Sequence, residues 1–322
     1  MAEAAARTKT RIDLKDQRIL LWLIILVLCV VVTAINPRFL SVDNIMVVLQ
    51  QVSVVGILTM GMALLLISGG IDLSMGSIMI FSAVVMAKVI MGGGDPLLAI
   101  LAGLSISTLF GFINGVIIAK SRCLPLIITL GMANVYFGIS LVVSNGKFLN
   151  FQQKFEWIRR TKLWDVVPVY MLAFFAIVVA FTAILLNLTK TGRRIVAVGG
   201  NEENAYLSGL RVNRFKILAY TVSGFFCGIA SIVFAARLDS VTSSATSANY
   251  ELSALTASIV GGVTFEGGRG TILGAFTGVL LIGLLSNAMT VLSINSYIQK
   301  IVQGAIIVLA VVFSNMDKIK RN

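Results

Sequence analysis

Long stretches of apolar residues dominate the chain and are separated by short segments rich in glycine, polar and charged residues. A helix needs about 20 apolar residues to cross the hydrocarbon core of a bilayer, so each long stretch is a candidate span. Ten are predicted, at residues 19–35, 45–67, 76–91, 97–119, 124–143, 166–188, 215–236, 251–265, 271–292 and 297–313. The third and eighth are short, and a broken segment is stable inside a membrane only where protein or a water-filled cavity covers its backbone. The pattern predicts an all-α polytopic membrane protein with about ten transmembrane helices, give or take two, some short or broken.

Basic residues predict how these helices are oriented, because cytoplasmic segments of membrane proteins carry an excess of Lys and Arg. Residues 1–18 form a basic tail, residues 19–313 the transmembrane domain and residues 314–322 a second basic tail. With ten crossings both tails are cytoplasmic, as is the basic loop 189–214. The loop 145–165 falls on the periplasmic side and disagrees with the rule, because it contains the basic residues Lys147, Lys154, Arg159, Arg160 and Lys162. The first apolar run exceeds the 7–15 residues of a typical signal-peptide core, which predicts an uncleaved first helix.

Composition supports the membrane class and removes most catalytic chemistry. The 322 residues are 57% hydrophobic and 12% charged, whereas about 25% are charged in an average soluble domain. There is no histidine, which excludes imidazole metal ligands and histidine-based triads, and we find neither a phosphate-binding loop nor a nucleophile elbow. Cys29, Cys123 and Cys227 lie far apart and are expected to be small core residues. We predict no catalytic residue and no metal site, so any ATP-driven work needs an ATPase on another chain.

Two glycine-rich segments interrupt apolar runs and are predicted to be helix breaks. One contains Gly69, Gly70, Asp72 and Ser74, and the other contains Gly261 and Gly262. Duplicated halves with broken helices are common in transporters, although chance similarity between two glycine-rich turns explains the pattern equally well. Asp72 is interpreted either as an ion or substrate contact or as a cap on the following helix, and capping is favoured.

Several neutral amides lie within the apolar runs. The candidate translocation-pathway residues are Gln50, Gln51, Asn114, Asn134 and Asn287. Each can bind a hydroxyl-rich solute, or each can pair with a neighbouring helix. The scarcity of ionisable groups within the runs argues against an ion-coupled carrier.

The loop 189–214 is predicted to contain a short helix. Asn201 is a suitable N-cap, Glu202 and Glu203 are favourable in the first turn, and Gly209 is a suitable terminator. Such an element fits a groove on a partner protein, and a plain surface loop is the alternative.

Several motifs resemble one family in order along the chain. The sequence from Ile67 to Ser77 (ISGGIDLSMGS), the segment 198–209 (VGGNEENAYLSG) and the segments TVSG at 221–224 and SIVGGVT at 258–264 are similar to those of permease subunits of bacterial sugar ABC importers of the ribose, xylose and galactose type. Met75 stands where that family often has valine. The resemblance covers residues 18–313, and branched-chain amino-acid permeases are more distant relatives with a similar plan.

This resemblance implies a bacterial inner-membrane subunit without enzymatic activity that translocates a ribose-like pentose or a hexose. It implies three kinds of partner: a second permease copy or a paralogue, ABC ATPase subunits that hold ATP and Mg, and a periplasmic sugar-binding protein. The ATPase-coupling residues carried over are Asn201, Glu202, Glu203, Asn204, Ala205, Leu207, Ser208 and Gly209. The alternatives are the same machinery for a branched-chain amino acid, nucleoside, polyol or autoinducer sugar, and an ion-coupled secondary carrier. On this reading the basic residues of loop 145–165 are expected to attract an acidic binding protein.

Overall fold

The computed structural model describes residues 17–121, 123–163 and 167–319. The predicted N-terminal tail 1–18 therefore lies largely outside the described residues, as does Arg122. Most of the predicted C-terminal tail 314–322 is instead helical, because α13 continues beyond the predicted end of the last span at 313 to Ile319. The helices with ten residues or more are α1 (Gln17–Ile35), α2 (Val42–Ile67), α3 (Met75–Met91), α4 (Pro96–Ser121), α5 (Pro125–Ser144), α7 (Val169–Leu188), α8 (Lys190–Gly200), α10 (Val212–Leu238), α11 (Tyr250–Val260), α12 (Ile272–Val291) and α13 (Ser296–Ile319). Two shorter helices are α6 (Glu156–Arg160) and α9 (Glu202–Leu207), and the 3-10 helices are η1 (Pro37–Leu40) and η2 (Ser243–Ala248). Apart from α8, each helix of the longer set coincides with one predicted apolar run.

Six of these helices are long and apolar enough to cross a membrane: α2, α4, α5, α7, α10 and α12. The eighth predicted run differs from the structure, because α11 ends at Val260 instead of continuing to residue 265. Gly262 adopts φ +85°, and its neighbour Val263 donates its N–H to the carbonyl of Ser258 at 3.0 Å. This left-handed termination closes the helix at its glycines, so α11 is a half-length helix.

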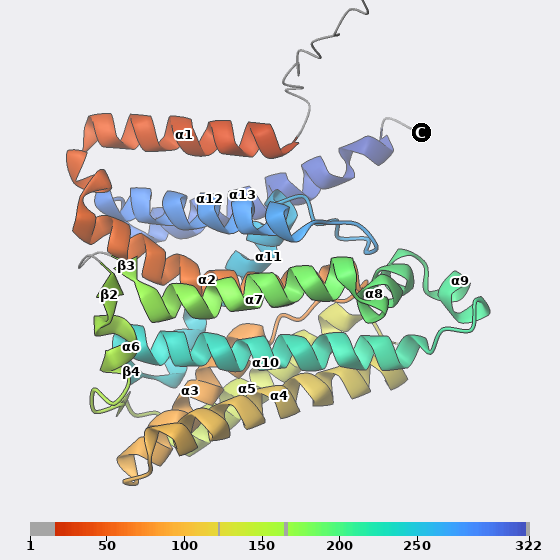
Figure 1. Cartoon of the computed structure of the whole chain (residues 1–322), viewed down its shortest axis with the longest axis horizontal. Helices are drawn as coiled ribbons and strands as arrows, with labels where there is room; N and C mark the ends of the chain where they lie inside the picture. The colour runs from red at the N-terminus through yellow and green to blue at the C-terminus, as the bar shows by residue number, and fades with distance from the viewer. Residues whose placement is uncertain (1–16, 122, 164–166, 320–322) are drawn as a thin grey trace, which may run out of the picture.

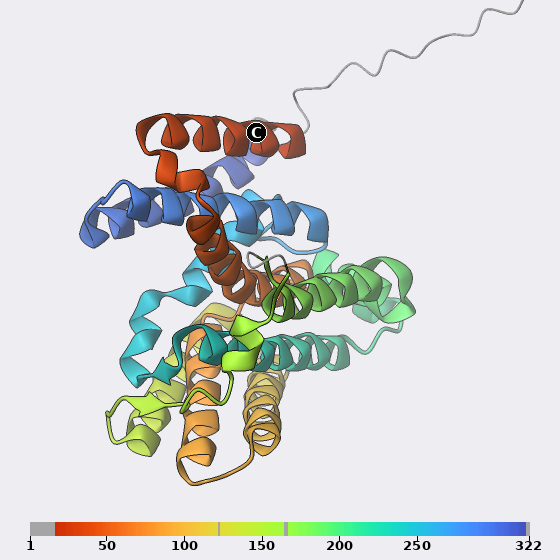
Figure 2. The same ribbon diagram turned by 60° about the vertical axis from the view of Figure 1, so that its left-hand side comes forward.

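The helices lie side by side in a layered bundle (Figure 1). α1 packs on α12 at one edge, α3, α4 and α5 form the opposite edge, and α2, α7 and α10 lie between them (Figures 1 and 2). α2 is buried along nearly all of its second half, as expected of a helix that is apolar on every face. Glycines bring α4 and α10 close together: a Cβ added to Gly111 would lie 2.7 Å from the Cα of Gly224. Such small residues allow close packing of helices in membranes.

The two ends of the bundle differ. At one end lie α8, α9, the start of α1 and the end of α13 (Figure 1). At the other lie α6 and the short strands β1 (Leu149–Asn150), β2 (Lys162–Leu163), β3 (Val167–Pro168) and β4 (Ser240–Val241). β1 pairs with β4 in antiparallel register, with Leu149 opposite Val241, and β2 pairs with β3, with Leu163 opposite Val167.

A buried polar cluster holds the chain between α2 and α3. The Asp72 carboxylate accepts hydrogen bonds from the backbone N–H and the hydroxyl of Ser74, at 2.8 and 2.5 Å, and from the Asn114 amide at 3.1 Å. The Tyr136 hydroxyl donates to the Asn114 side-chain oxygen at 2.8 Å. The carboxylate therefore closes the turn before α3 and ties it to α4 and α5. This corrects the expected helix cap: Ser74, which is the N-cap residue of α3, makes no side-chain bond to its first turn.

The cysteines only partly match the expectation of core residues. Cys227 is buried, Cys29 is half-buried and Cys123 is exposed; all three are free thiols. Cys123 lies in the short connection between α4 and α5, outside the packed part of either helix.

Replacement of Asn114 by alanine is expected to destabilise the fold. It leaves the buried Asp72 carboxylate and Tyr136 hydroxyl each without one partner, which costs about 1–3 kcal/mol. Asn134→Ala is the matched control, because that amide is exposed and, within the described part of the chain, it bonds to the Leu130 carbonyl of its own helix and to no other residue. Thermal unfolding of the purified chain in detergent should show a lower midpoint for Asn114→Ala than for Asn134→Ala. Equal midpoints would show that the Asp72 cluster does not stabilise the segment between α2 and α3.

Candidate functional site

The projecting α8–α9 element is the first candidate site. α8 begins at a Thr189 cap, whose hydroxyl oxygen accepts from the Gly192 N–H at 2.9 Å. Asn201 then ends α8 and begins α9, and its side chain accepts from the Asn204 N–H at 2.8 Å. Gly209 adopts φ +79°, and Leu210 donates to the Ala205 carbonyl at 3.0 Å, which terminates α9. The structure thus contains the short helix predicted from the sequence, with the predicted cap and terminator.

α9 presents an apolar surface away from the bundle. Tyr206 and Leu207 are 71% and 75% exposed, whereas Ala205 between α9 and the bundle is buried. An ion pair between Lys216 and Glu202 joins α9 to the start of α10. The sequence interpretation missed Tyr206, although its position beside Leu207 and next to the small Ala205 marks the outer face of the helix. Of the predicted coupling residues, all are exposed except Ala205, which is buried.

The two predicted helix breaks lie where the sequence placed them. Gly69 and Gly70 follow α2, and Gly69 has φ +77°, while Gly261 and Gly262 follow α11. Gly70 contributes a backbone N–H that donates to the Leu65 carbonyl at 2.8 Å. Gly261 lies against Gly274 of α12, where an added Cβ would overlap the backbone. Each break therefore closes its helix and allows the following segment to pack tightly.

The candidate pathway amides do not converge on one place. Asn114 belongs to the Asp72 cluster, and Asn287 exchanges two hydrogen bonds with Asn44 at 2.8 and 2.9 Å. Asn134 faces outward from α5. Gln50 is half-buried, and Gln51 donates to the Ser286 hydroxyl at 3.3 Å. For Asn114 and Asn287, pairing with a neighbouring helix is the role that the structure shows.

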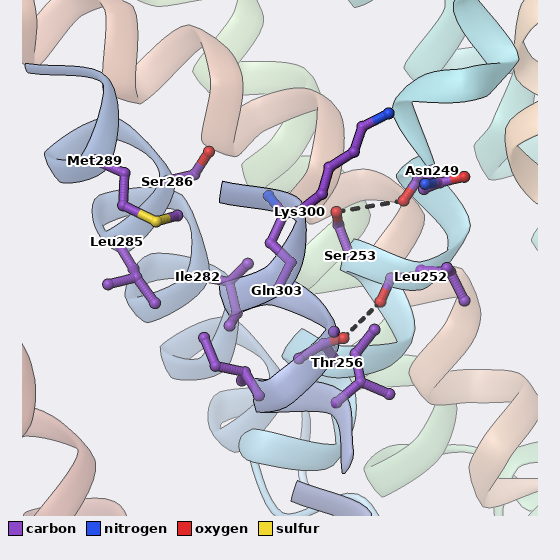
Figure 3. Close-up of a pocket in the computed structure, with 13 residues that line it drawn as sticks. Asn249, Leu252, Ser253, Thr256, Ile282, Leu285, Ser286, Met289, Lys300 and Gln303 are labelled. Atoms are coloured by element: carbon purple, nitrogen blue, oxygen red, sulfur yellow. Dashed lines mark hydrogen bonds between the residues drawn. The ribbon is translucent and has the colours of Figure 1, made fainter. Parts of the chain in front are cut away.

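A cavity of about 120 Å³ lies between α11, α12 and α13. Its polar lining residues are Asn249, Ser253, Thr256, Ser286, Lys300 and Gln303, and its other walls are mainly Leu, Ile and Met. Figure 3 shows the Lys300 side chain extending toward Asn249, the residue that precedes α11. Apolar walls with a few polar groups are typical of small-molecule sites. The sequence could not reveal this cavity, because its walls come from three helices. The candidate residue Gln51 lies next to it, since its side chain donates a hydrogen bond to the lining residue Ser286.

The basic segment at the opposite end is partly neutralised. Arg159 and Arg160 form ion pairs with Glu156 at 3.1 and 2.7 Å. Lys147 and Lys154 have no such acidic partner among residues 17–121, 123–163 and 167–319, and Lys162 lies in β2. Within the same described part of the chain, we find no group of His, Cys, Asp and Glu suited to a metal ion.

Comparisons with known proteins identify the family. Residues 44–311 match the family model described as "Branched-chain amino acid transport system / permease component". The chain is 36% identical to a ribose import permease protein of Bacillus subtilis, with 88% of each chain covered, and 35% identical to that of Escherichia coli, with 95% of each covered. It is also 33% identical to the galactose/methyl galactoside import permease protein of Escherichia coli, over 92% of this chain and 93% of the relative. No solved structure matches. The chain therefore belongs to this family of ABC-importer permease components and is a multi-pass membrane transport subunit, with no enzymatic activity of its own.

Proposed function

We propose that the chain moves a monosaccharide, a ribose-like pentose or a hexose, across the bacterial inner membrane. The observation that carries this proposal is the similarity, over about nine-tenths of the chain, to permeases named for ribose, arabinose and galactose. The family description names branched-chain amino acids, which makes such an amino acid the second candidate cargo. The polar groups of the α11–α13 cavity are suited to a hydroxyl-rich solute, because amides and hydroxyls both donate and accept hydrogen bonds.

ATP and Mg belong in this proposal to a separate ATPase, which docks on α9. Exposed Tyr206 and Leu207 give α9 the apolar anchor that a helix-in-groove contact requires. Aromatic and large apolar anchors of this kind carry most of the binding energy at such interfaces. Asn201 is shared by the end of α8 and the start of α9. A partner that binds α9 is therefore also held close to the end of α8. The end of the bundle that carries α9 is then cytoplasmic.

A second permease copy or a paralogue is proposed to cover part of the exposed surface. Asn134 is exposed on α5, and only 17% of the most apolar stretch of that helix is buried within this chain. Gly131 and Gly138 on the same helix have open space above them. An amide facing lipid is costly, whereas small residues and an amide suit contact with another helix. A partner permease at this face would shield the Asn134 amide from lipid and pack closely against Gly131 and Gly138.

Leu207→Arg is expected to weaken ATPase binding. A charged side chain at the outer face of α9 removes an apolar anchor, and loss of such an anchor costs about 2 kcal/mol or more. Co-purification of the ATPase with the permease from detergent-solubilised membranes measures this loss. Phe148→Arg is the control, because Phe148 is similarly exposed at the opposite end of the bundle. Full ATPase recovery with Leu207→Arg, at wild-type uptake, would contradict the docking role of α9.

The basic segment of loop 145–165 is proposed to attract an acidic periplasmic binding protein. Lys147→Glu combined with Lys154→Glu should slow its association by about tenfold, because surface charges steer encounter, and should flatten the salt dependence of the rate. Surface plasmon resonance with the permease in nanodiscs measures both quantities. Arg159→Gln with Arg160→Gln should have a smaller effect, because it removes two positive charges, whereas the lysine variant reverses two and so changes the net charge by four. An unchanged rate and salt slope in the lysine variant would exclude the steering role.

A further inference from the structure

Three segments that are far apart in the sequence meet by backbone contact near the end of α8. The segments are the last turn of α2 with the break that follows it, the end of α8 at Gly199 and Gly200, and the loop between α11 and α12 at Gly267 and Gly268. Gly268 donates its N–H to the carbonyl oxygen of Ile67, the last residue of α2, at 2.9 Å. This bond links the end of α2 at the first break to the loop that follows the second break. We call this three-segment contact the glycine joint.

Gly199 of α8 fits between the two breaks, with room for hydrogen but not for a methyl group. A Cβ at Gly199 would overlap the Ile67 carbonyl oxygen and would lie 2.8 Å from the Ser68 carbonyl carbon. From the other side, a Cβ at Gly267 would lie 3.0 Å from the Gly69 Cα and would overlap the Gly199 carbonyl oxygen. The three backbones therefore touch without an intervening side chain. Rigid backbone contacts transmit displacement where flexible side chains absorb it.

The joint is close in the chain to the element that meets the partner. Asn201 is shared by α8 and α9 and follows Gly200 directly. No flexible loop separates α9 from Gly199. At its other end α8 is fixed to α7, because a Cβ at Gly192 would overlap the backbone at Leu185. A displacement of α9 consequently pivots α8 about the α7 end and moves Gly199 at the joint.

We propose that the glycine joint is the point through which movement of α9 reaches both helix breaks at once. Gly199, Gly267 and Gly268 are then positioning residues for transport: they contact no cargo, and they make α2–α3 and α11–α12 respond together. The α11–α13 cavity lies along one of these two units, so its shape changes with the joint. This inference rests on the proposed function, because it takes the ATPase as the source of the displacement.

Gly199→Ala and Gly200→Ala form a matched pair of variants. Both replace a glycine by alanine in the last turn of α8, so both raise helix propensity in the same way. They differ in the joint, because a Cβ at Gly200 has its nearest neighbour, the Gly268 Cα, at 3.9 Å, an ordinary contact. Any difference between them therefore reports on the close approach of Gly199 to Ile67.

The test reconstitutes permease, ATPase and binding protein in proteoliposomes and measures sugar uptake together with ATP hydrolysis. Gly199→Ala is expected to retain the ATPase, because the surface of α9 is unchanged. It should lose at least tenfold in uptake and the stimulation of hydrolysis by loaded binding protein, whereas Gly200→Ala should match the wild type. Uptake by Gly199→Ala within twofold of the wild type would overturn the proposed role of the glycine joint in transport. Failure of the proposed function has a different signature, namely no ATP-driven uptake with the wild-type chain.

A second measurement decides the matter if Gly199→Ala fails to assemble. Spin labels are attached at Ala197→Cys and Arg269→Cys, both exposed, in a chain with Cys29→Ser and Cys123→Ser. If the segments of the glycine joint move together, ATP leaves the distance between these two labels unchanged. A second pair, Ala197→Cys with Phe148→Cys at the opposite end of the bundle, should change its distance with ATP. Separation of the first pair by more than about 5 Å, one helical turn, or an unchanged second pair, would overturn the proposal.

Discussion

Inside a membrane every backbone polar group must find its partner within the protein, and two helices of this chain stop before their neighbours do. Several of the resulting N–H and carbonyl groups are paired with distant parts of the chain. The Tyr220 hydroxyl accepts from the Ile71 N–H and donates to the Ile71 carbonyl, at 3.1 and 2.8 Å. The Ile67 carbonyl accepts from Gly268. Because these partners come from α10 and from the other break, satisfying the backbone also fixes how the helices are arranged.

The buried polar side chains of this chain serve its packing, whereas α9 is exposed at one end of the bundle. The buried Asp72 carboxylate is saturated by Ser74 and Asn114, so it stabilises the fold. α9, in contrast, projects from the bundle with its apolar face uncovered and is joined to α8 through a single shared residue. In the proposed function this chain supplies the transport path, and an ATPase bound at α9 supplies the energy. The similarity to importer permeases agrees with a chain that forms the path and does not itself hydrolyse ATP.

The helices could be predicted from the sequence because membrane spans are defined by local composition. Some ends are local as well: Asn201 caps α9 through a neighbour three residues away. The end of α11 follows the glycines at 261 and 262, which the sequence marked as a break, and not the apolar run, which continues to 265. Contacts between distant residues could not be predicted. For Asn114 the sequence allowed either a pathway contact or pairing with a neighbouring helix. Its partners Asp72 and Tyr136 lie on other elements, so only the packing shows that its amide is already used. The cavity between α11, α12 and α13 was missed for the same reason, and so was the contact of Gly199 with Ile67.

The central claim is that this chain is a conduit whose movement is driven by another protein. Proteoliposomes containing the chain alone, then the chain with ATPase and loaded binding protein, test it most directly through uptake of radiolabelled monosaccharide. The account predicts no uptake by the chain alone under a proton or sodium gradient, and uptake that requires ATP when the partners are present. Concentrative uptake by the chain alone, driven by an ion gradient, would contradict it.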